Sequence, residues 1–289
     1  MPIQSPEQRR AHAEARRADW LQFATVITVE AEPFPRVLAL LRHGRFKEHL
    51  AIIGRLGAND HSPTHPVLFL LLLRAIGKAD RERVFRALEF VLAHFEQRSG
   101  TRFAELRSRL LDRRNGHAGV VAELEFAARF LVAGRDIDVL DPPGPDFRAA
   151  LAGRSYLLEV KALRDSTVGE PHLLMGDGSN NSGSFCANLD PWAEKKLAAT
   201  LEQARDQARR CHADCSIAVL ANDAFFGNDA LRDSWQSLSF RWADTGLVGA
   251  WLRTGESTPN FHCLPVHRPA LEELTGVLRA SWVFDRSMF

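Results

Sequence analysis

The chain has 289 residues, of which 45% are hydrophobic and 25% charged, and these values are typical of globular proteins rather than disordered or fibrous ones. The longest apolar run, residues 67–73, is far shorter than the roughly 20 residues of a membrane-spanning helix, and the polar, basic N-terminal stretch does not resemble a secretory signal. Four cysteines are too few for a disulfide scaffold of this length, which favours reduced thiols and a cytoplasmic location.

The charges are unevenly distributed, although the formal net charge is only +1. Residues 1–116 hold 20 Lys and Arg against 13 Asp and Glu, a balance of +7, and the remainder holds 17 against 23, a balance of −6. A basic binding surface beside an acidic, cation-binding site would produce this asymmetry, and so would charged faces that only solvate ordinary helices. Charge alone therefore leaves nucleic-acid binding open.

The N-terminal part of the chain has the apolar spacing of helices. The first begins at a cap-like Ser5 followed by Pro6, and the second is interrupted near Gly44. We therefore expect an all-helical domain over residues 1–115, of recognition or assembly type. Its helices are predicted over 5–24, 33–57, 62–77, 79–100 and 101–116.

The pattern then changes to alternating helices and strands. A helix is predicted over 117–134, then a strand over 136–141 and a hairpin turning at Gly153. A long helix over 191–214 follows, and a crossover helix of this kind sets the next strand parallel to an earlier one. Residues 116–289 are therefore expected to form an α/β domain. Its later strands are predicted over 215–222 and 246–255.

Two charges interrupt the apolar stretch YLLEVKAL at residues 156–163. Because side chains alternate along a strand, Glu159 and Lys161 share one face. On a solvated face such a pair is ordinary, whereas buried charges are costly unless they are paired or bind a metal. Asp146 favours the second interpretation, since a tight hairpin would bring its carboxylate beside Glu159.

A Pro-Asp dipeptide at 145–146, followed thirteen residues on by Glu159-Val160-Lys161, resembles the PD-(D/E)XK nuclease superfamily. The preceding segment, GVVAELEFAARFLVAG, resembles the first helix of that superfamily, and its helix carboxylate would be Glu123. The resemblance covers about residues 116–222 and does not extend to the N-terminal helices. It implies an α/β, restriction-endonuclease-like core, which is a mixed central sheet flanked by helices.

The resemblance also implies roles for these residues. Asp146, Glu159 and the backbone carbonyl of Val160 would offer hard oxygen ligands to Mg²⁺, for which Mn²⁺ can substitute. Glu123 would bind a second ion or orient a water. Lys161 would stabilise negative charge on the phosphoryl oxygens or help position the nucleophile.

The helix after these strands offers a further candidate. In several branches of the superfamily a Gln or Lys from this helix reaches the active site. Gln203 and Gln207 lie one turn apart on one helical face, and Gln203 is predicted here to be catalytic. An exposed polar face would explain both glutamines equally well.

These features predict a Mg²⁺-dependent nuclease that hydrolyses phosphodiester bonds, in DNA rather than RNA, with a homodimer left open. One alternative is a catalytically inactive nuclease-like fold that acts as a nucleic-acid-binding or assembly module. Another is a helical interaction protein in which Glu159 and Lys161 form only a surface pair. A zinc site is a further hypothesis, although the spacing of its Cys and His residues is not that of a recognised zinc motif. The residues concerned are Cys211, His212, Cys215, His262, Cys263 and His267.

Overall fold

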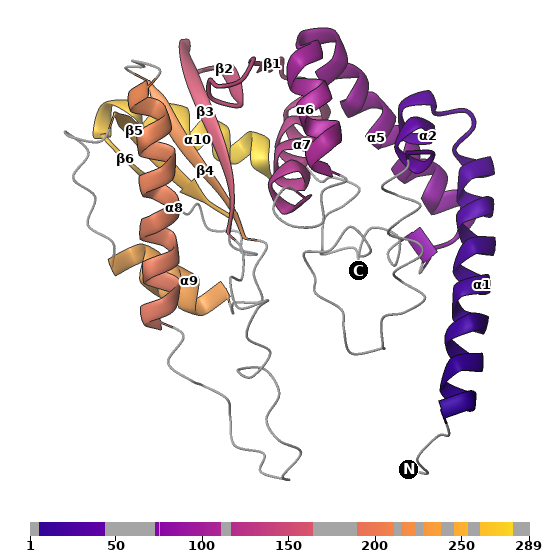
Figure 1. Ribbon diagram of the computed structural model, residues 1–289. Helices are drawn as coiled ribbons and strands as arrows, with labels where there is room; N and C mark the ends of the chain where they lie inside the picture. The colour runs from indigo at the N-terminus through magenta and orange to yellow at the C-terminus, as the bar shows by residue number, and fades with distance from the viewer. Residues whose placement is uncertain are drawn as a thin grey trace. The chain divides into compact units, whose positions relative to one another are not determined.

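The computed structural model describes residues 6–43, 73–74, 76–110, 117–163, 190–210, 215–222, 228–237, 246–253 and 261–279. These residues form two compact units that divide between Val120 and Val121 (Figure 1). In the described ranges we find no helix with both the length and the apolar character needed to cross a membrane. The helical segments predicted over 44–57 and 62–72 lie outside the described residues.

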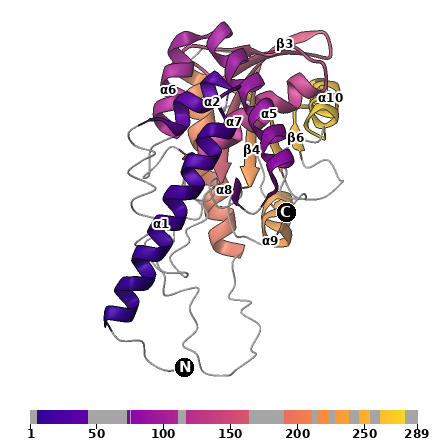
Figure 2. The same ribbon diagram turned by 90° about the vertical axis from the view of Figure 1, so that its right-hand side faces the viewer.

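The first unit is helical in its described parts (Figure 2). Its core includes Ile27, Phe34 and Phe85, and the rings of Phe34 and Phe85 lie 6.1 Å apart. Along each of these helices the apolar residues recur at the spacing that places them on one buried face. They are α1 (Pro6–Glu30), α2 (Pro35–Leu41), α5 (Lys78–Arg98) and α6 (Gly100–Leu110).

Polar contacts tie the helices of this unit together. Arg81 of α5 binds both carboxylate oxygens of Glu30 at the end of α1, at 2.6 and 2.8 Å. Glu89 of α5 accepts the backbone N–H groups of Arg36 and Val37 at 2.9 and 3.1 Å. It thereby satisfies two donors at the start of α2 that have no partner within the helix itself.

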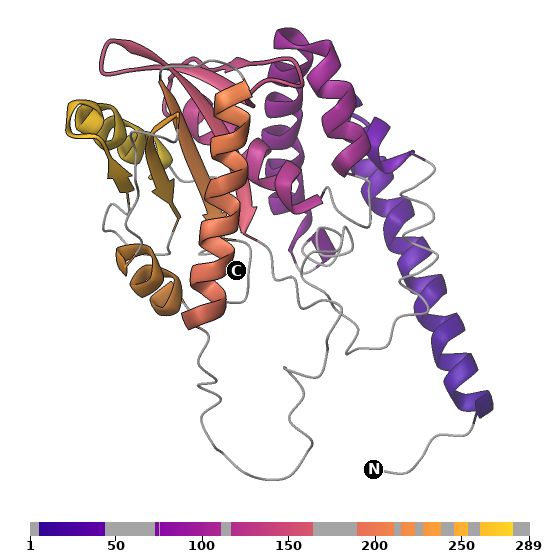
Figure 3. The same cartoon turned by 60° about the vertical axis from the view of Figure 1, so that its left-hand side comes forward.

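The second unit is built on a six-stranded mixed sheet with the strand order β1-β2-β3-β4-β5-β6 (Figure 3). The pairs β1–β2, β2–β3 and β5–β6 are antiparallel, whereas β3–β4 and β4–β5 are parallel. The predicted mixed α/β class, with helices flanking the sheet, is confirmed. The strands are Asp138–Val139, Phe147–Leu151, Arg154–Leu163, Ser216–Asn222, Leu247–Leu252 and Phe261–Cys263.

Helices cover both faces of this sheet (Figure 1). On one face α8 (Asp190–Arg210) and α9 (Asn228–Ser237) bury Leu197, Leu201 and Trp235 against apolar residues of β3, β4 and β5. On the other lie α7 (His117–Val132) and α10 (Arg268–Leu278). The ring of Phe126 in α7 lies 5.4 Å from that of Phe147 in β2, and the indole N–H of Trp251 in β5 donates to Thr275 Oγ1 of α10 at 3.1 Å.

The hairpin between β2 and β3 turns where it was predicted to turn. Leu151 pairs with Arg154, and the two residues between them, Ala152 and Gly153, have positive φ angles of 46° and 75°. Two positive φ angles define the tight turn that matches the twist of paired strands. The Ala152 N–H donates to Glu273 of α10 at 2.6 Å, which helps to hold alanine in this unfavourable conformation.

Candidate functional site

Asp146 lies at the start of β2, directly across from the charged part of β3. The last pair of the ladder joins Phe147 to Leu158, so one further step places Asp146 opposite Glu159. Residues that face each other in an antiparallel ladder have Cβ atoms about 4.5–5.5 Å apart. The turn and the strand register are therefore compatible with the prediction that the Asp146 carboxylate lies beside Glu159.

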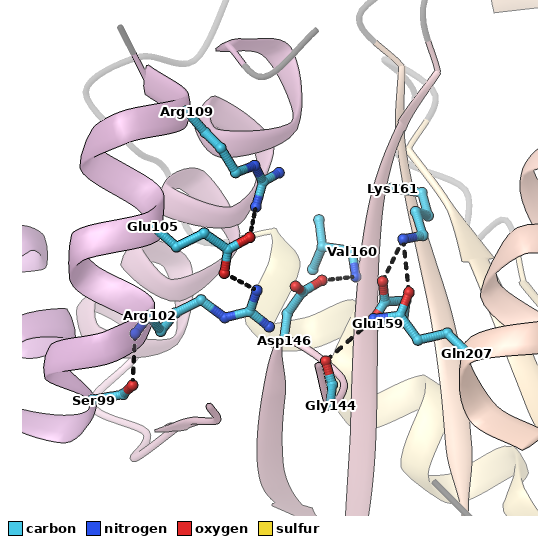
Figure 4. Close-up of polar contacts among 10 residues, drawn as sticks. All are labelled: Ser99, Arg102, Glu105, Arg109, Gly144, Asp146, Glu159, Val160, Lys161 and Gln207. Atoms are coloured by element: carbon cyan, nitrogen blue, oxygen red, sulfur yellow. Dashed lines mark hydrogen bonds and ion pairs between the residues drawn. The ribbon is translucent and has the colours of Figure 1, made fainter. Parts of the chain in front are cut away.

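The Asp146 side chain takes the place of a missing ladder partner. The Leu157 N–H donates to the carbonyl of Cys215, on the β4 side of β3. Backbone N–H groups point to alternate sides along a strand, so the N–H of Val160, three residues on, points towards β2. Because β2 begins only at Phe147, that N–H has no β2 backbone opposite it and donates instead to Asp146 Oδ2 at 2.8 Å (Figure 4). Asp146 is 4% exposed, and this bond fixes its carboxylate against β3.

Glu159 and Lys161 form a pair in which the carboxylate is buried and the ammonium group is partly exposed. Glu159 is 4% exposed on the sheet face covered by α8, and its carboxylate forms an ion pair with the Lys161 ammonium group (Figure 4). The Lys161 side chain keeps 25% of its surface exposed. The carboxylate is therefore held in the protein interior, and the ammonium group beside it reaches towards solvent. The reading of this pair as an ordinary surface pair does not fit the burial of Glu159.

The helix glutamine that reaches this site is Gln207 and not Gln203. Gln203 is exposed, whereas the Gln207 Oε1 atom accepts a hydrogen bond from Lys161 at 3.1 Å. Gln207 Nε2 donates to the carbonyl of Gly144 at 3.2 Å. The prediction of Gln203 is corrected by one helical turn, because the position of α8 over β3 decides which turn faces the lysine.

The two glutamates of α7 have different surroundings. Glu123 is 2% exposed and lies one turn before Phe126, on the helix face that packs on β2. Glu125 binds Arg129 at 2.7 Å and Arg253 at 2.5 Å. Two arginines therefore hold the buried Glu125 in structural ion pairs.

A metal at this site would have few side-chain ligands. In the part of the chain that the structure describes, no three His, Cys, Asp or Glu side chains are grouped closely enough to hold a metal ion. The structure therefore does not join Glu123 to Asp146 and Glu159 in one ligand cluster. The Val160 carbonyl lies on the same side of β3 as its N–H, which is the side of Asp146. Two carboxylates and a carbonyl form the kind of oxygen set that Mg²⁺ uses while it keeps several waters.

The two cysteines in the described residues show no comparable arrangement. Cys215 and Cys263 are free thiols and half-buried, and burial raises the pKa of the Cys263 thiol. Cys211 and His212 lie outside the described residues. Within the described ranges the zinc reading therefore has no group of three ligands.

Gly144 is the one member of the site with no signal in the sequence, because it contributes only a backbone carbonyl. Gln207 did carry a signal, since it shares a helical face with Gln203. No protein-family model, curated protein or solved structure matches this chain significantly. The functional assignment therefore depends on the geometry of these residues and on the resemblance in their spacing.

Proposed function

We propose that this chain is a divalent-metal-dependent nuclease with a restriction-endonuclease-like core, acting on DNA. The observation that carries the proposal is the hydrogen bond that holds the Asp146 carboxylate at Val160 of β3, next to the ion pair of Glu159 and Lys161. The sheet order and the helices on both faces are compatible with such a core. The buried position of Glu159 also supports it, because an isolated buried carboxylate is costly unless a cation compensates it.

Each residue has a role that follows from its chemistry. Asp146, Glu159 and the Val160 carbonyl would hold Mg²⁺ or Mn²⁺; a carboxylate has about four lone-pair sites, so the Val160 hydrogen bond leaves Asp146 capacity for a cation. The ion would polarise the scissile phosphate and lower the pKa of a water molecule. Lys161, partly exposed and held by Gln207, would place a positive charge on the phosphoryl oxygens.

A second candidate is a nuclease-like fold without catalysis that binds nucleic acid. The ion pair between Glu159 and Lys161 favours it, because the ammonium group already neutralises the carboxylate that a metal would use. The two candidates differ in metal binding. A catalytic site takes up Mn²⁺ in competition with Lys161, whereas a silent site does not.

The testing experiment is cleavage of supercoiled plasmid DNA with Mg²⁺ by the wild-type chain and by Asp146→Asn. The asparagine oxygen can still accept the Val160 N–H, so we expect the free energy of unfolding to change by less than about 1 kcal/mol. We expect cleavage to fall by more than about a hundredfold, since even residues behind the ligands contribute about 10–100-fold.

Asp141→Asn is the matched control, because Asp141 is an exposed aspartate in the same turn and its substitution removes the same charge. It should cleave at the wild-type rate. Equal cleavage by the wild type and Asp146→Asn would contradict the proposal. Lys161→Ala is a weaker probe, because it leaves the buried Glu159 without its cation and so destabilises the fold.

A further inference from the structure

Gln207 connects two parts of the site that are far apart in the sequence. Its Oε1 atom accepts from Lys161 Nζ on β3 at 3.1 Å, and its Nε2 atom donates to the Gly144 carbonyl at 3.2 Å (Figure 4). An amide side chain offers a donor and an acceptor on one planar group without adding charge. Gln207 therefore bridges the strand that carries Lys161 and the turn that contains Gly144.

Gln207 thereby completes a ring of contacts that joins α8, the turn at Gly144 and β3. Gly144 lies two residues before Asp146, and Asp146 is bound to β3 through the Val160 N–H. Val160 is followed in the chain by Lys161, which donates a hydrogen bond to Gln207. The turn is thus attached to β3 at one point directly and at a second point through α8. Both attachments act on Asp146, whose carboxylate is 4% exposed.

We propose that Gln207 is a positioning residue that sets the placement of Asp146 relative to Lys161, and thereby the affinity of the site for a divalent cation. The part of this inference that concerns the cation rests on the proposed function. The hydrogen bonds of Gln207 go to Lys161 and to Gly144 rather than to Asp146 or Glu159, so it acts through the lysine and through the turn. As a neutral amide it holds the ammonium group without cancelling its charge, which a carboxylate at this position would do.

Two substitutions distinguish the effect of the hydrogen bond to Gly144 from that of the hydrogen bond with Lys161. Gln207→Met keeps the length of the side chain and removes both bonds. Gln207→Glu keeps an acceptor for Lys161, but it places a carboxylate against the Gly144 carbonyl and so removes the tie to the turn. Gln236→Met is the control, because Gln236 is an exposed glutamine on α9, in the same unit.

The readouts are the exchange rate of the Val160 amide hydrogen, followed by NMR, and the affinity for Mn²⁺ alone, measured by isothermal titration calorimetry. The Val160 amide reports on Asp146 because that carboxylate is its hydrogen-bond acceptor. In Gln207→Met and Gln207→Glu we expect the Val160 amide hydrogen to exchange faster with solvent. We also expect both variants to bind Mn²⁺ about 10–100-fold more weakly, because residues that orient metal ligands contribute in this range. Gln236→Met should match the wild type in both.

Faster Val160 exchange in a Gln207 variant that melts at the wild-type temperature supports the proposal. If Gln207→Met does not fold, Gln207→Glu still tests the hydrogen bond to the Gly144 carbonyl, which both variants remove. Wild-type Val160 exchange and wild-type Mn²⁺ affinity in the Gln207 variants would overturn it. A wild-type chain that neither binds Mn²⁺ nor cleaves DNA would contradict the proposed function, and Val160 exchange would then decide alone whether Gln207 positions the turn.

Discussion

Tyr156 and His267 form a buried pair in the second unit that is not part of the candidate site. The Tyr156 hydroxyl and His267 Nδ1 lie 2.9 Å apart in a hydrogen bond, and the rings meet edge to face. Burial, with a smaller contribution from the charge of Arg154, lowers the pKa of His267, and burial raises the pKa of Tyr156. The folded state therefore favours the neutral histidine.

This pair predicts a loss of stability on mild acidification. The unfolded chain protonates His267 near pH 6.5 but the folded chain only at lower pH, so the unfolded state binds more protons and the free energy of unfolding decreases as the pH falls through this window. The contribution of one group is at most about 1.4 kcal/mol per pH unit. Urea unfolding between pH 7.5 and 5.5 should show this decrease, and His267→Gln should reduce it.

Glu30 of the first unit titrates in a separate window. Hydrogen bonding to Arg81 lowers the pKa of Glu30 below its ordinary value of 4.5, so the stability that Glu30 contributes is lost only as the pH falls below that value. Measurements above pH 5 therefore separate the effect of His267 from that of Glu30. Parallel pH curves for the wild type and His267→Gln would show that His267 does not titrate between the folded and unfolded states in this window.

At the scale of elements, α10 packs closely on the sheet at Gly249 of β5. A Cβ atom at Gly249 would lie 3.0 Å from Leu271 Cδ2, and 3.2 Å from both Cys263 Cβ and the His262 carbonyl oxygen. Leu271 belongs to α10, and the other two belong to β6. The leucine side chain can rotate away, but the atoms of β6 move only with their strand. The absence of a side chain is therefore what lets β6 and α10 approach β5.

Two glycine substitutions should therefore have opposite signs. Gly249→Ala overpacks this contact, and we expect it to lower the free energy of unfolding by about 1–3 kcal/mol. Gly276→Ala lies inside α10, where a Cβ atom meets nothing within 4 Å, so we expect it to raise stability by roughly 0.5–1 kcal/mol through helix propensity. Urea unfolding of both variants checks this, and a neutral Gly249→Ala would mean that β6 shifts at no cost.

At the scale of the whole molecule, the uneven charge has a consequence for the proposed DNA substrate. Residues 1–116 carry a balance of +7, and the remainder carries −6. If phosphate contacts dominate the binding of DNA, each contact contributes a slope of about −0.9 to the dependence of log affinity on log salt concentration. The net charge of +1 would hide such a basic region, but salt dependence would reveal it.

We therefore expect the affinity of full-length Asp146→Asn for duplex DNA to fall steeply with salt. Three or more phosphate contacts would weaken binding by roughly forty-fold or more between 50 and 200 mM KCl. Fluorescence anisotropy with a labelled duplex measures this without cleavage. Binding that does not change with salt would contradict the electrostatic interpretation, and so would the absence of binding at 50 mM.

Local patterns in the sequence were enough to predict several features of the second unit. The alternating pattern and Gly153 predicted the hairpin, and the strands pair from Leu151 and Arg154 at its turn to Phe147 and Leu158. These features are local because a two-residue turn and a period of two residues set the pairing of neighbouring strands. The strand β6 and the helix α10 were missed, although the apolar residues of α10 have helical spacing; they are Ala270, Leu271, Leu274, Val277 and Leu278.

Local patterns did not predict the burial of Glu159, the contact of Gln207 with Lys161 or the ion pairs of Glu125. Each depends on how a helix lies on the sheet, and a shift of one helical turn moves every side chain of that helix past its neighbours. Local periodicity states which helix face is apolar, but not where along a strand the face is placed. Long-range packing decides that placement, and with it the residues that meet in the candidate site.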